Sequence, residues 1–433
     1  MVSLEREILE ELPENIEMIR RQVHEFSVKE VRPASLKLDK MDPADIAKED
    51  SPYMDVFRKM AKLGYHGALV PEEHGGLELP PLACYIILEE LGWGSLGIAT
   101  GLGVDWVALD CISLVARLTS SDVLVDEIVR PWVKDEEGKY HGCWAVTEPE
   151  HGSDWILAPA HERPEEYGKG QVIAEKEGDE FVLNGPKALW PSAGAVATHG
   201  LVHVCFPPEA DMGRAGICIV PLNQDGVTKG VPPNRLGFRD NPQAEVIFEN
   251  VRIPEEYMFV QRGLYPVFIR ALLSATSCGM NAFATGLTRA AFEEALNYAI
   301  EREQGGKRLV DLPTIRVKLH GMFEKWQASR IYGRKLADIV WGNIYKVELD
   351  MPFPAAITAQ TLAKRNVFDV ANAALEIHGG YGNTKEFLVE KLFRDARASL
   401  IEDGTPEVLG LAAIGDFLGR HDITELYRVY GMK

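Results

Sequence analysis

The chain has no surplus of positive charge. Its 433 residues include 46 lysines and arginines against 65 aspartates and glutamates, a formal net charge of -19. Nucleic acid is therefore not an expected partner, because binding to a phosphate backbone needs excess basic side chains. The first 14 residues lack both the apolar stretch of a signal peptide and the arginine-rich character of a transit peptide. We expect a cytoplasmic protein, or a matrix protein that has lost its presequence.

Cysteine is scarce as well. The six cysteines form no C-x-x-C pair and all lie in apolar or mixed runs. This pattern predicts buried free thiols in a reducing compartment rather than a disulfide framework. No metal site is expected. No apolar run was found to reach the length of a membrane span, so no membrane span is expected either.

Hydrophobic periodicity divides the chain into three parts and predicts an α+β fold. Residues 1–140 have mainly helical spacing, as in the apolar series from Leu4 to Phe26. Residues 141–257 contain short strand patterns punctuated by prolines, with a hairpin turn at Gly178 and Asp179. Residues 258–433 return to helical spacing. The helices expected there are Thr285–Arg302, Leu312–Trp341, Ala355–Leu375 and Phe387–Ala398.

The most informative motif lies near the C-terminus. Glu402 and Asp403 precede Gly404–Thr405, in a loop between two helical patterns. A glycine-rich segment, Glu376–Gly382, and then Glu390–Arg397 lead up to this loop. In this order the features resemble the C-terminal signature of the acyl-CoA dehydrogenase flavoprotein family. That resemblance implies a helical domain, a β-barrel-like domain and a C-terminal four-helix bundle.

Two segments of the middle part resemble the flavin-contacting blocks of that family. Trp144–Asp154 contains a T-E-x-x-x-G-S-D pattern, and Asn184–Gly194 contains a tryptophan followed two residues later by a serine. Glycine permits close backbone approach to a flat ring, hydroxyls can bond its polar edge, and an indole offers an apolar face. The resemblance assigns these residues to an FAD site: Thr147, Gly152, Ser153, Trp190 and Ser192. Taken alone, the first segment could be a turn cluster and the tryptophan a core aromatic.

Two further segments resemble family positions that reach the flavin of a neighbouring subunit. The guanidinium of Arg302 suits a diphosphate, and Gly379–Gly380 can present backbone N–H groups to an anion. Taken alone, the arginine could be a surface residue paired with Glu301 or Glu303, and the glycines a helix C-cap.

The resemblance also suggests the catalytic group. In the family, a glutamate immediately before the Gly-Thr removes the α-proton of an acyl thioester, and Asp403, one methylene shorter, stands there. Glu402 is the second candidate base, or else a solvated loop acid. Asp105 lies in a segment that resembles the wall of the family's acyl pocket, where it could be a second acid. The alternative is an ordinary helix N-cap. The resemblance assigns Thr405 and Glu407 to the FAD site as well.

Three functional hypotheses accommodate these motifs. The leading one is an FAD-dependent acyl-CoA dehydrogenase, a homotetramer like its relatives, that passes electrons to an electron-transfer flavoprotein. The resemblance leaves the acyl group open, including branched and cyclic acyl groups. The second is a flavin oxidase resembling nitroalkane oxidase, which also uses an aspartate as carbon base; Pro191 after the tryptophan and Gly305–Gly306 favour it. The third is a non-enzymatic flavoprotein or scaffold, against which the retained Asp403 argues.

Overall fold

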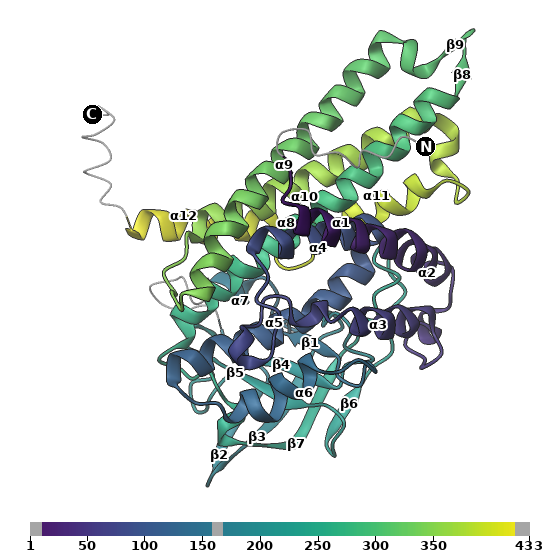
Figure 1. The fold of residues 1–433 in the computed structure, drawn as a ribbon. Coiled ribbons are helices and arrows are strands. Elements are labelled where there is room, and N and C mark those ends of the chain that lie inside the picture. The colour runs from purple at the N-terminus through teal and green to yellow at the C-terminus, as the bar shows by residue number, and fades with distance from the viewer. Residues whose placement is uncertain (1–10, 158–167, 421–433) are drawn as a thin grey trace, which may run out of the picture.

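The computed structural model describes residues 11–157 and 168–420, in which helices precede and follow a middle part made of strands (Figure 1). The helices before the strands are α1 Glu14–Phe26, α2 Arg32–Leu38, α3 Pro52–Leu63, α4 Pro81–Gly94, α5 Leu96–Thr119 and α6 Arg130–Val133. The later helices are α8 Tyr265–Glu301, α9 Pro313–Tyr345, α10 Phe353–His378, α11 Leu388–Ser399 and α12 Pro406–Arg420. The expected C-terminal helices agree closely, except that α8 begins well before Thr285.

Local capping explains where several helices begin and end. The Ser51 hydroxyl accepts a hydrogen bond from the Met54 N–H at the start of α3, and Pro52 takes the first helical position. Gly64 ends this helix in the left-handed region, at φ 71°. Ser95 likewise caps α5, where its hydroxyl accepts from the Ile98 N–H. These caps set both ends of α3 and the start of α5, which is one of the helices that form the site.

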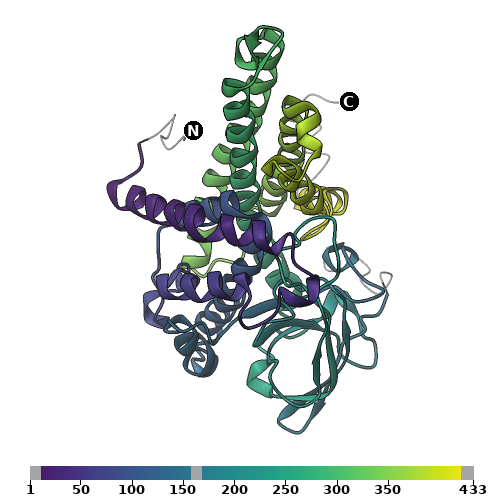
Figure 2. The same cartoon turned by 90° about the vertical axis from the view of Figure 1, so that its right-hand side faces the viewer.

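The middle strands form two small sheets. The strands are β1 Gly142–Ala145, β2 Ile173–Glu177, β3 Glu180–Lys187, β4 His199–Val204, β5 Gly216–Pro221, β6 Val227–Lys229 and β7 Val246–Pro254, and a short helix, α7 Asp154–Leu157, follows β1. One sheet has the order β1-β4-β5 and the other β2-β3-β7-β6. A bridge between Ile173 and Cys205 joins them around a shared apolar core, which gives the barrel-like form visible in Figure 2. The expected α+β fold and the hairpin at Gly178 are confirmed.

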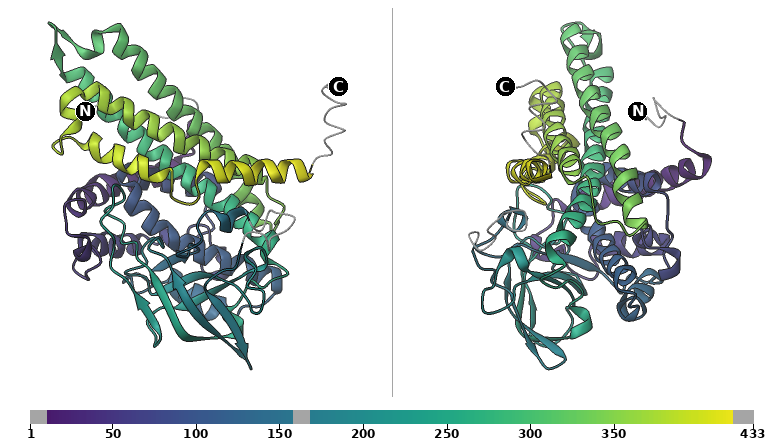
Figure 3. Two further views of the ribbon diagram at one scale, coloured as in Figure 1. Left: turned by 180° about the vertical axis from the view of Figure 1, so that it is seen from behind. Right: turned by 90° about the vertical axis from the view of Figure 1, so that its left-hand side faces the viewer.

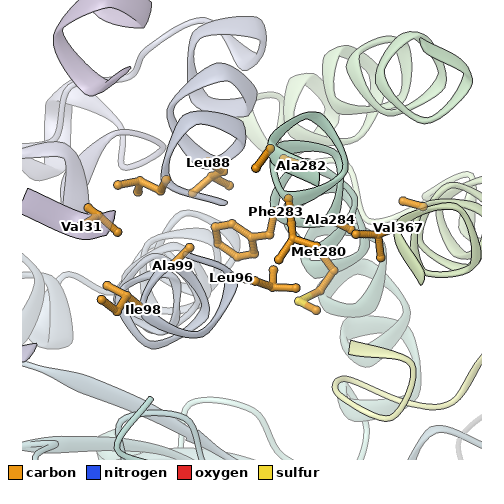
Figure 4. Packing of buried hydrophobic residues seen from close by; sticks show 14 of the residues in the cluster. Val31, Leu88, Leu96, Ile98, Ala99, Met280, Ala282, Phe283, Ala284 and Val367 are labelled. Atoms are coloured by element: carbon orange, nitrogen blue, oxygen red, sulfur yellow. The ribbon is translucent and has the colours of Figure 1, made fainter. Parts of the chain in front are cut away.

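The helical core depends on close packing of α4 and α5 against α8 (Figure 4). Phe283 of α8 lies among Leu88, Leu96 and Ala99. A Cβ atom at Gly286 would lie 2.0 Å from the Glu89 carbonyl oxygen, so the two backbones meet where that side chain is absent. The long α8 and α9 then project beyond this core to a two-strand hairpin, β8 Glu303–Gln304 and β9 Lys307–Arg308 (Figure 3).

Two expectations about apolar residues have different outcomes. All six cysteines are free and buried, as predicted. The expectation that no segment is long and apolar enough to span a membrane is wrong. Two helices, Leu96–Thr119 and Tyr265–Glu301, have the length and the apolar composition that a membrane span needs. Within the apolar windows of these two helices, 83% and 78% of the residues are buried inside the protein, as in core helices. The proposed domain limits at 140 and 257 fall between the observed helices and strands, and as domain boundaries they stay a prediction.

The contact between α4 and α8 gives a testable prediction. Gly286→Ala is expected to lower the free energy of unfolding by about 1–3 kcal/mol, because the methyl group meets backbone atoms that cannot move independently. Gly321→Ala in α9 is the matched control, since nothing lies within 4 Å of its added Cβ. That control is expected to stabilise by up to about 1 kcal/mol. Urea unfolding of both variants tests this, and equal effects would contradict the close contact.

Candidate active site

A cavity of about 750 Å³ lies between the helices and the strands. Its walls come from α5, α8, the end of α9, the segments after β1 and β3, and the loop between α11 and α12. Most of the lining is apolar, and Trp106, Phe283 and Trp341 are among its aromatic residues. Glu402 and Asp403 both line it. The structure therefore brings both predicted acids to one largely apolar space.

The loop that carries these acids is held by a buried lysine. Lys364 of α10 is fully buried, and its ammonium group donates hydrogen bonds to the carbonyl oxygens of Glu402 and Gly404, the latter at 2.8 Å. Asp403 between them has a left-handed backbone, with φ 52°. Such a conformation is unfavourable for a residue with a side chain and persists where its surroundings fix it. The lysine supplies that restraint.

Asp403 lies in an environment that favours the neutral carboxyl group. Burial raises its pKa to about 6, and the negative charge of Glu402 adds to this, although the nearby Lys364 acts in the opposite direction. Its Oδ2 accepts a hydrogen bond from Gln360 Nε2 at 3.1 Å. The Gln360 Oε1 in turn accepts from the Ser277 hydroxyl at 2.8 Å, which orients the amide. A carboxyl group with a pKa near 6 is well matched to proton abstraction near neutral pH.

Glu402 is not a solvated loop acid, and that alternative is wrong. Its Oε1 accepts hydrogen bonds from Gln243 Nε2 at 2.8 Å and from the Ser192 hydroxyl at 3.2 Å. Burial raises its pKa as well, against the opposing charges of Arg235 and Lys364. Glu402 is therefore tied into the polar wall, whereas the Asp403 carboxylate keeps one hydrogen-bond donor in the described part of the chain, Gln360.

The residues expected to contact a flavin lie together at the cavity. Thr147, Gly152, Ser153, Trp190 and Ser192 all line it. Trp190 is 48% exposed, so the alternative of a core aromatic is wrong. Ser153 also reaches the acid-bearing loop, where its hydroxyl accepts from the Thr405 N–H at 3.4 Å.

Three features of this wall fit a flat, polar-edged ring. An added Cβ at Gly152 would meet nothing within 4 Å, so a ring can approach the backbone there. The Oε1 atom of Gln243 is buried and has no hydrogen-bond partner among the described residues, so it can accept from a bound group. The exposed indole of Trp190 offers an apolar face for stacking.

The remaining predicted cofactor residues do not line this cavity. Arg302 and Tyr381 lie together, with the guanidinium 5.8 Å from the ring centroid, and in residues 11–157 and 168–420 we find no ion pair between Arg302 and Glu301 or Glu303. Gly379 is the C-cap of α10, with φ 59°, and Gly380 follows it. Glu407 is exposed in the first turn of α12. Their contact with a cofactor, like that of Thr405, stays a prediction.

Asp105 is neither a helix N-cap nor a residue of this cavity. It lies within α5, whose N-cap is Ser95, and its Oδ1 accepts from the Gly142 N–H at 2.6 Å and pairs with His141 Nδ1 at 2.9 Å. Its side chain thus anchors β1 to α5. The acid of α5 that lines the cavity is Asp110. Helical spacing could have identified it, because positions 103, 107, 110 and 114 share one face.

Gln360 and Lys364 were also missed from the sequence, although their positions carry a signal. They are four residues apart in a helix that is otherwise largely apolar, and both are buried. Polar residues at this spacing on a buried face must find partners inside the protein. Those partners, Asp403 and the carbonyl oxygens around it, lie about forty residues later, beyond what helical spacing can indicate.

Comparison with known families matches all three parts of the chain. Residues 13–117 match the family description "Acyl-CoA dehydrogenase, N-terminal domain", residues 143–251 the "middle domain" and residues 267–416 the "C-terminal domain". These matches follow one another in order and together span most of the chain.

Individual proteins agree with this result. A "3-(aryl)acrylate reductase" of Clostridium sporogenes is 29% identical over 414 residues, which is 94% of this chain and 99% of that protein. A mitochondrial "short-chain specific acyl-CoA dehydrogenase" of Rattus norvegicus is 28% identical over 412 residues, covering 94% of this chain and 91% of the relative. The solved butyryl-CoA dehydrogenase of Megasphaera elsdenii has the same fold, with a TM-score of 0.80, 24% identity, and coverage of 94% and 99%.

The restraint on the loop gives a second prediction. Lys364→Met removes the donors to two carbonyl oxygens while keeping a side chain of similar length. We expect the free energy of unfolding to fall by about 2–4 kcal/mol, because buried acceptors lose their partner. The matched control is Lys335→Met at an exposed position of α9, expected to change it by less than about 0.5 kcal/mol. If both variants unfold alike in urea, Lys364 does not hold the loop.

Proposed function

Because the chain belongs to the acyl-CoA dehydrogenase family, we propose that it is an FAD-dependent enzyme that removes two hydrogens from the α and β carbons of an acyl-CoA thioester. The observation that carries this proposal is the position of Asp403. Its carboxyl group, with a pKa of about 6, lines the same largely apolar cavity as the residues that suit a flavin ring. Asp403 is the proposed base.

The reaction needs a base for the α-proton, an acceptor for the β-hydride and hydrogen-bond donors to the thioester oxygen. Residues of this chain contribute to each. Asp403 takes the α-proton, and its raised pKa makes it a stronger base than an exposed aspartate. When bound, the flavin supplies the acceptor for the β-hydride at N5. Thr147, Gly152, Ser153, Trp190 and Ser192 are proposed to hold its ring beside the acyl chain. The product is the α,β-unsaturated thioester.

The α-proton becomes acidic enough only if the thioester oxygen is stabilised as negative charge develops on it. The backbone N–H of Asp403 is suited to this task. Among the described residues, this N–H group donates no hydrogen bond to a backbone carbonyl oxygen in the turns and loops. It also belongs to the residue that carries the base, so one short loop can place both groups next to the same substrate carbon.

Assembly and electron transfer belong to the same proposal. Arg302, Gly379 and Gly380 do not line the cavity, which is compatible with their reaching the flavin of a neighbouring copy. We propose a homotetramer in the cytoplasm that passes electrons to an electron-transfer flavoprotein. Sedimentation equilibrium of the purified protein would test the assembly.

A flavin oxidase of the nitroalkane oxidase type is the second candidate. The aspartate at position 403, in place of the family's glutamate, favours it, and so does Pro191 between Trp190 and Ser192. An aspartate carboxyl group in a dry pocket can remove a carbon-bound proton from a nitroalkane as well as from a thioester.

An anaerobic titration separates the two candidates. Purified protein with its flavin band is titrated with straight, branched, cyclic and aryl-bearing acyl-CoAs, and separately with nitroethane. Bleaching of the band by an acyl-CoA is the expected result. Bleaching by nitroethane alone would replace the proposal by the oxidase, and a protein that neither carries nor acquires a flavin would refute both.

Asp403→Asn tests the base. We expect the rate of flavin reduction by the best acyl-CoA to fall at least a thousandfold, since the amide cannot accept the proton. In the wild type, kcat/KM is expected to rise with pH through about 6, because the ionised carboxylate is the active form. Glu402→Gln is the matched control and is expected to lose much less activity.

Thermal unfolding of Asp403→Asn distinguishes loss of the catalytic base from loss of the fold. The folded-state pKa of Asp403 lies above its ordinary value, so the stability tied to this group is present at low pH and is lost as the pH rises through about 6. Asp403→Asn is therefore expected to unfold at a higher temperature than the wild type at pH 8. Full activity in Asp403→Asn with loss in Glu402→Gln would transfer the role to Glu402.

A further inference from the structure

A third acid, Asp110, lines the cavity on the side formed by α5. It lines the cavity with Val107 and Leu114, which are one helical turn away on either side. Trp341 and Ile344 from the end of α9 line the same cavity. This part of the wall is otherwise apolar, so a carboxyl group there is the exception that needs an explanation.

The Asp110 side chain is partly buried, and its carboxyl group has no partner among the described residues. Among the residues that the structure describes, no hydrogen bond or ion pair reaches it. Burial alone raises its pKa well above the ordinary value. The neighbouring Tyr345 hydroxyl does not satisfy it, because that hydroxyl donates to the Leu79 carbonyl oxygen at 2.7 Å.

Asp105, one and a half turns earlier in the same helix, shows what a structural acid looks like here. Its Oδ1 accepts from a backbone N–H and pairs with a histidine, and it does not line the large cavity. Asp110 differs in each respect. A carboxyl group in a largely apolar cavity loses its contact with water when a ligand fills the space, so a ligand that provides a hydrogen-bond partner is favoured over one that does not.

We propose that Asp110 recognises a hydroxyl group on the far part of the acyl chain, so that the preferred substrates are hydroxylated acyl-CoAs rather than plain hydrocarbon ones. The inference rests on the proposed dehydrogenase function. The cavity supplies the geometry: an apolar, partly aromatic space that has the base on one wall and a single unpartnered carboxyl group on another.

A hydroxyl group complements this carboxyl group. In its neutral form Asp110 has one O–H donor and a carbonyl oxygen acceptor, and a hydroxyl has one donor and two acceptor sites, so two hydrogen bonds can form. A hydrocarbon chain would leave the acid unsatisfied, and such sites discriminate strongly against the analogue that lacks the polar group. A hydroxyl on an aryl or an alkyl end would satisfy the same chemistry.

Matched substrate pairs test the proposal. Flavin reduction is measured with 3-(4-hydroxyphenyl)propionyl-CoA against 3-phenylpropionyl-CoA, and with ω-hydroxyacyl-CoAs against plain acyl-CoAs of equal length. We expect at least one hydroxylated member to exceed its plain partner tenfold or more in kcat/KM. In Asp110→Leu, which is close in size and apolar, this ratio is expected to fall to one or below, mainly through KM. Asp110→Asn is expected to keep part of the preference, since the amide retains a donor and an acceptor.

A binding measurement tests the role of Asp110 without relying on catalytic turnover. Calorimetry with the enoyl-CoA products of each pair is expected to show tighter binding of the hydroxylated product to the wild type and no such difference in Asp110→Leu. Circular dichroism and thermal unfolding establish that the variant is folded. If acyl-CoAs reduce the flavin but no hydroxylated member is preferred, or the preference survives Asp110→Leu, the inference is wrong and the dehydrogenase stands. If no acyl-CoA reduces the flavin, both the inference about Asp110 and the proposed dehydrogenase function are wrong.

Discussion

A buried cation fixes the position of the proposed base. The Lys364 ammonium group has no ion pair in the described part of the chain and instead bonds the carbonyl oxygens on either side of Asp403. Burial lowers its pKa to about 8, and the nearby Asp403 and Glu402 oppose this. One side chain thus does two things. It holds a strained backbone that aims the Asp403 carboxyl group, and its charge keeps the pKa of that group from rising further.

Three acids share the cavity, and their partners distinguish them. Glu402 is bound by an amide and a hydroxyl, so its oxygens belong to the wall. Asp403 has one amide donor and a pKa of about 6, which suits a group that must gain and lose a proton. Asp110 has no partner in the described chain, and its burial favours the neutral form. The environment, not the residue type, thus distinguishes the structural Glu402 from the proposed base, Asp403, and from the proposed recognition group, Asp110.

The sequence predicted what is local or repeated, and it failed where distant segments meet. Helical spacing gave α9 to α11 closely, and a turn signal gave the β2–β3 hairpin. Five of the ten predicted cofactor residues, all from the middle part of the chain, and both loop acids line one cavity, whereas the other five do not. Asp105 was misplaced because a polar residue near a helix start suggests a cap, whereas its partners, His141 and Gly142, come from another element. Spacing alone cannot reveal such long-range pairs.

The two ends of the proposed substrate site are linked through α8. This helix meets α4 at Gly286, and its Phe283 ring lies where a side chain at Gly103 of α5 would stand. α8 also packs against α10, which carries Lys364 and Gln360. A change in the spacing between α5 and α8 would therefore move Asp110 relative to Asp403. Because closely packed helices shift as rigid units, we expect the small residues at these contacts to influence the distance between the proposed recognition group and the proposed base, and with it the length of acyl group that would fit.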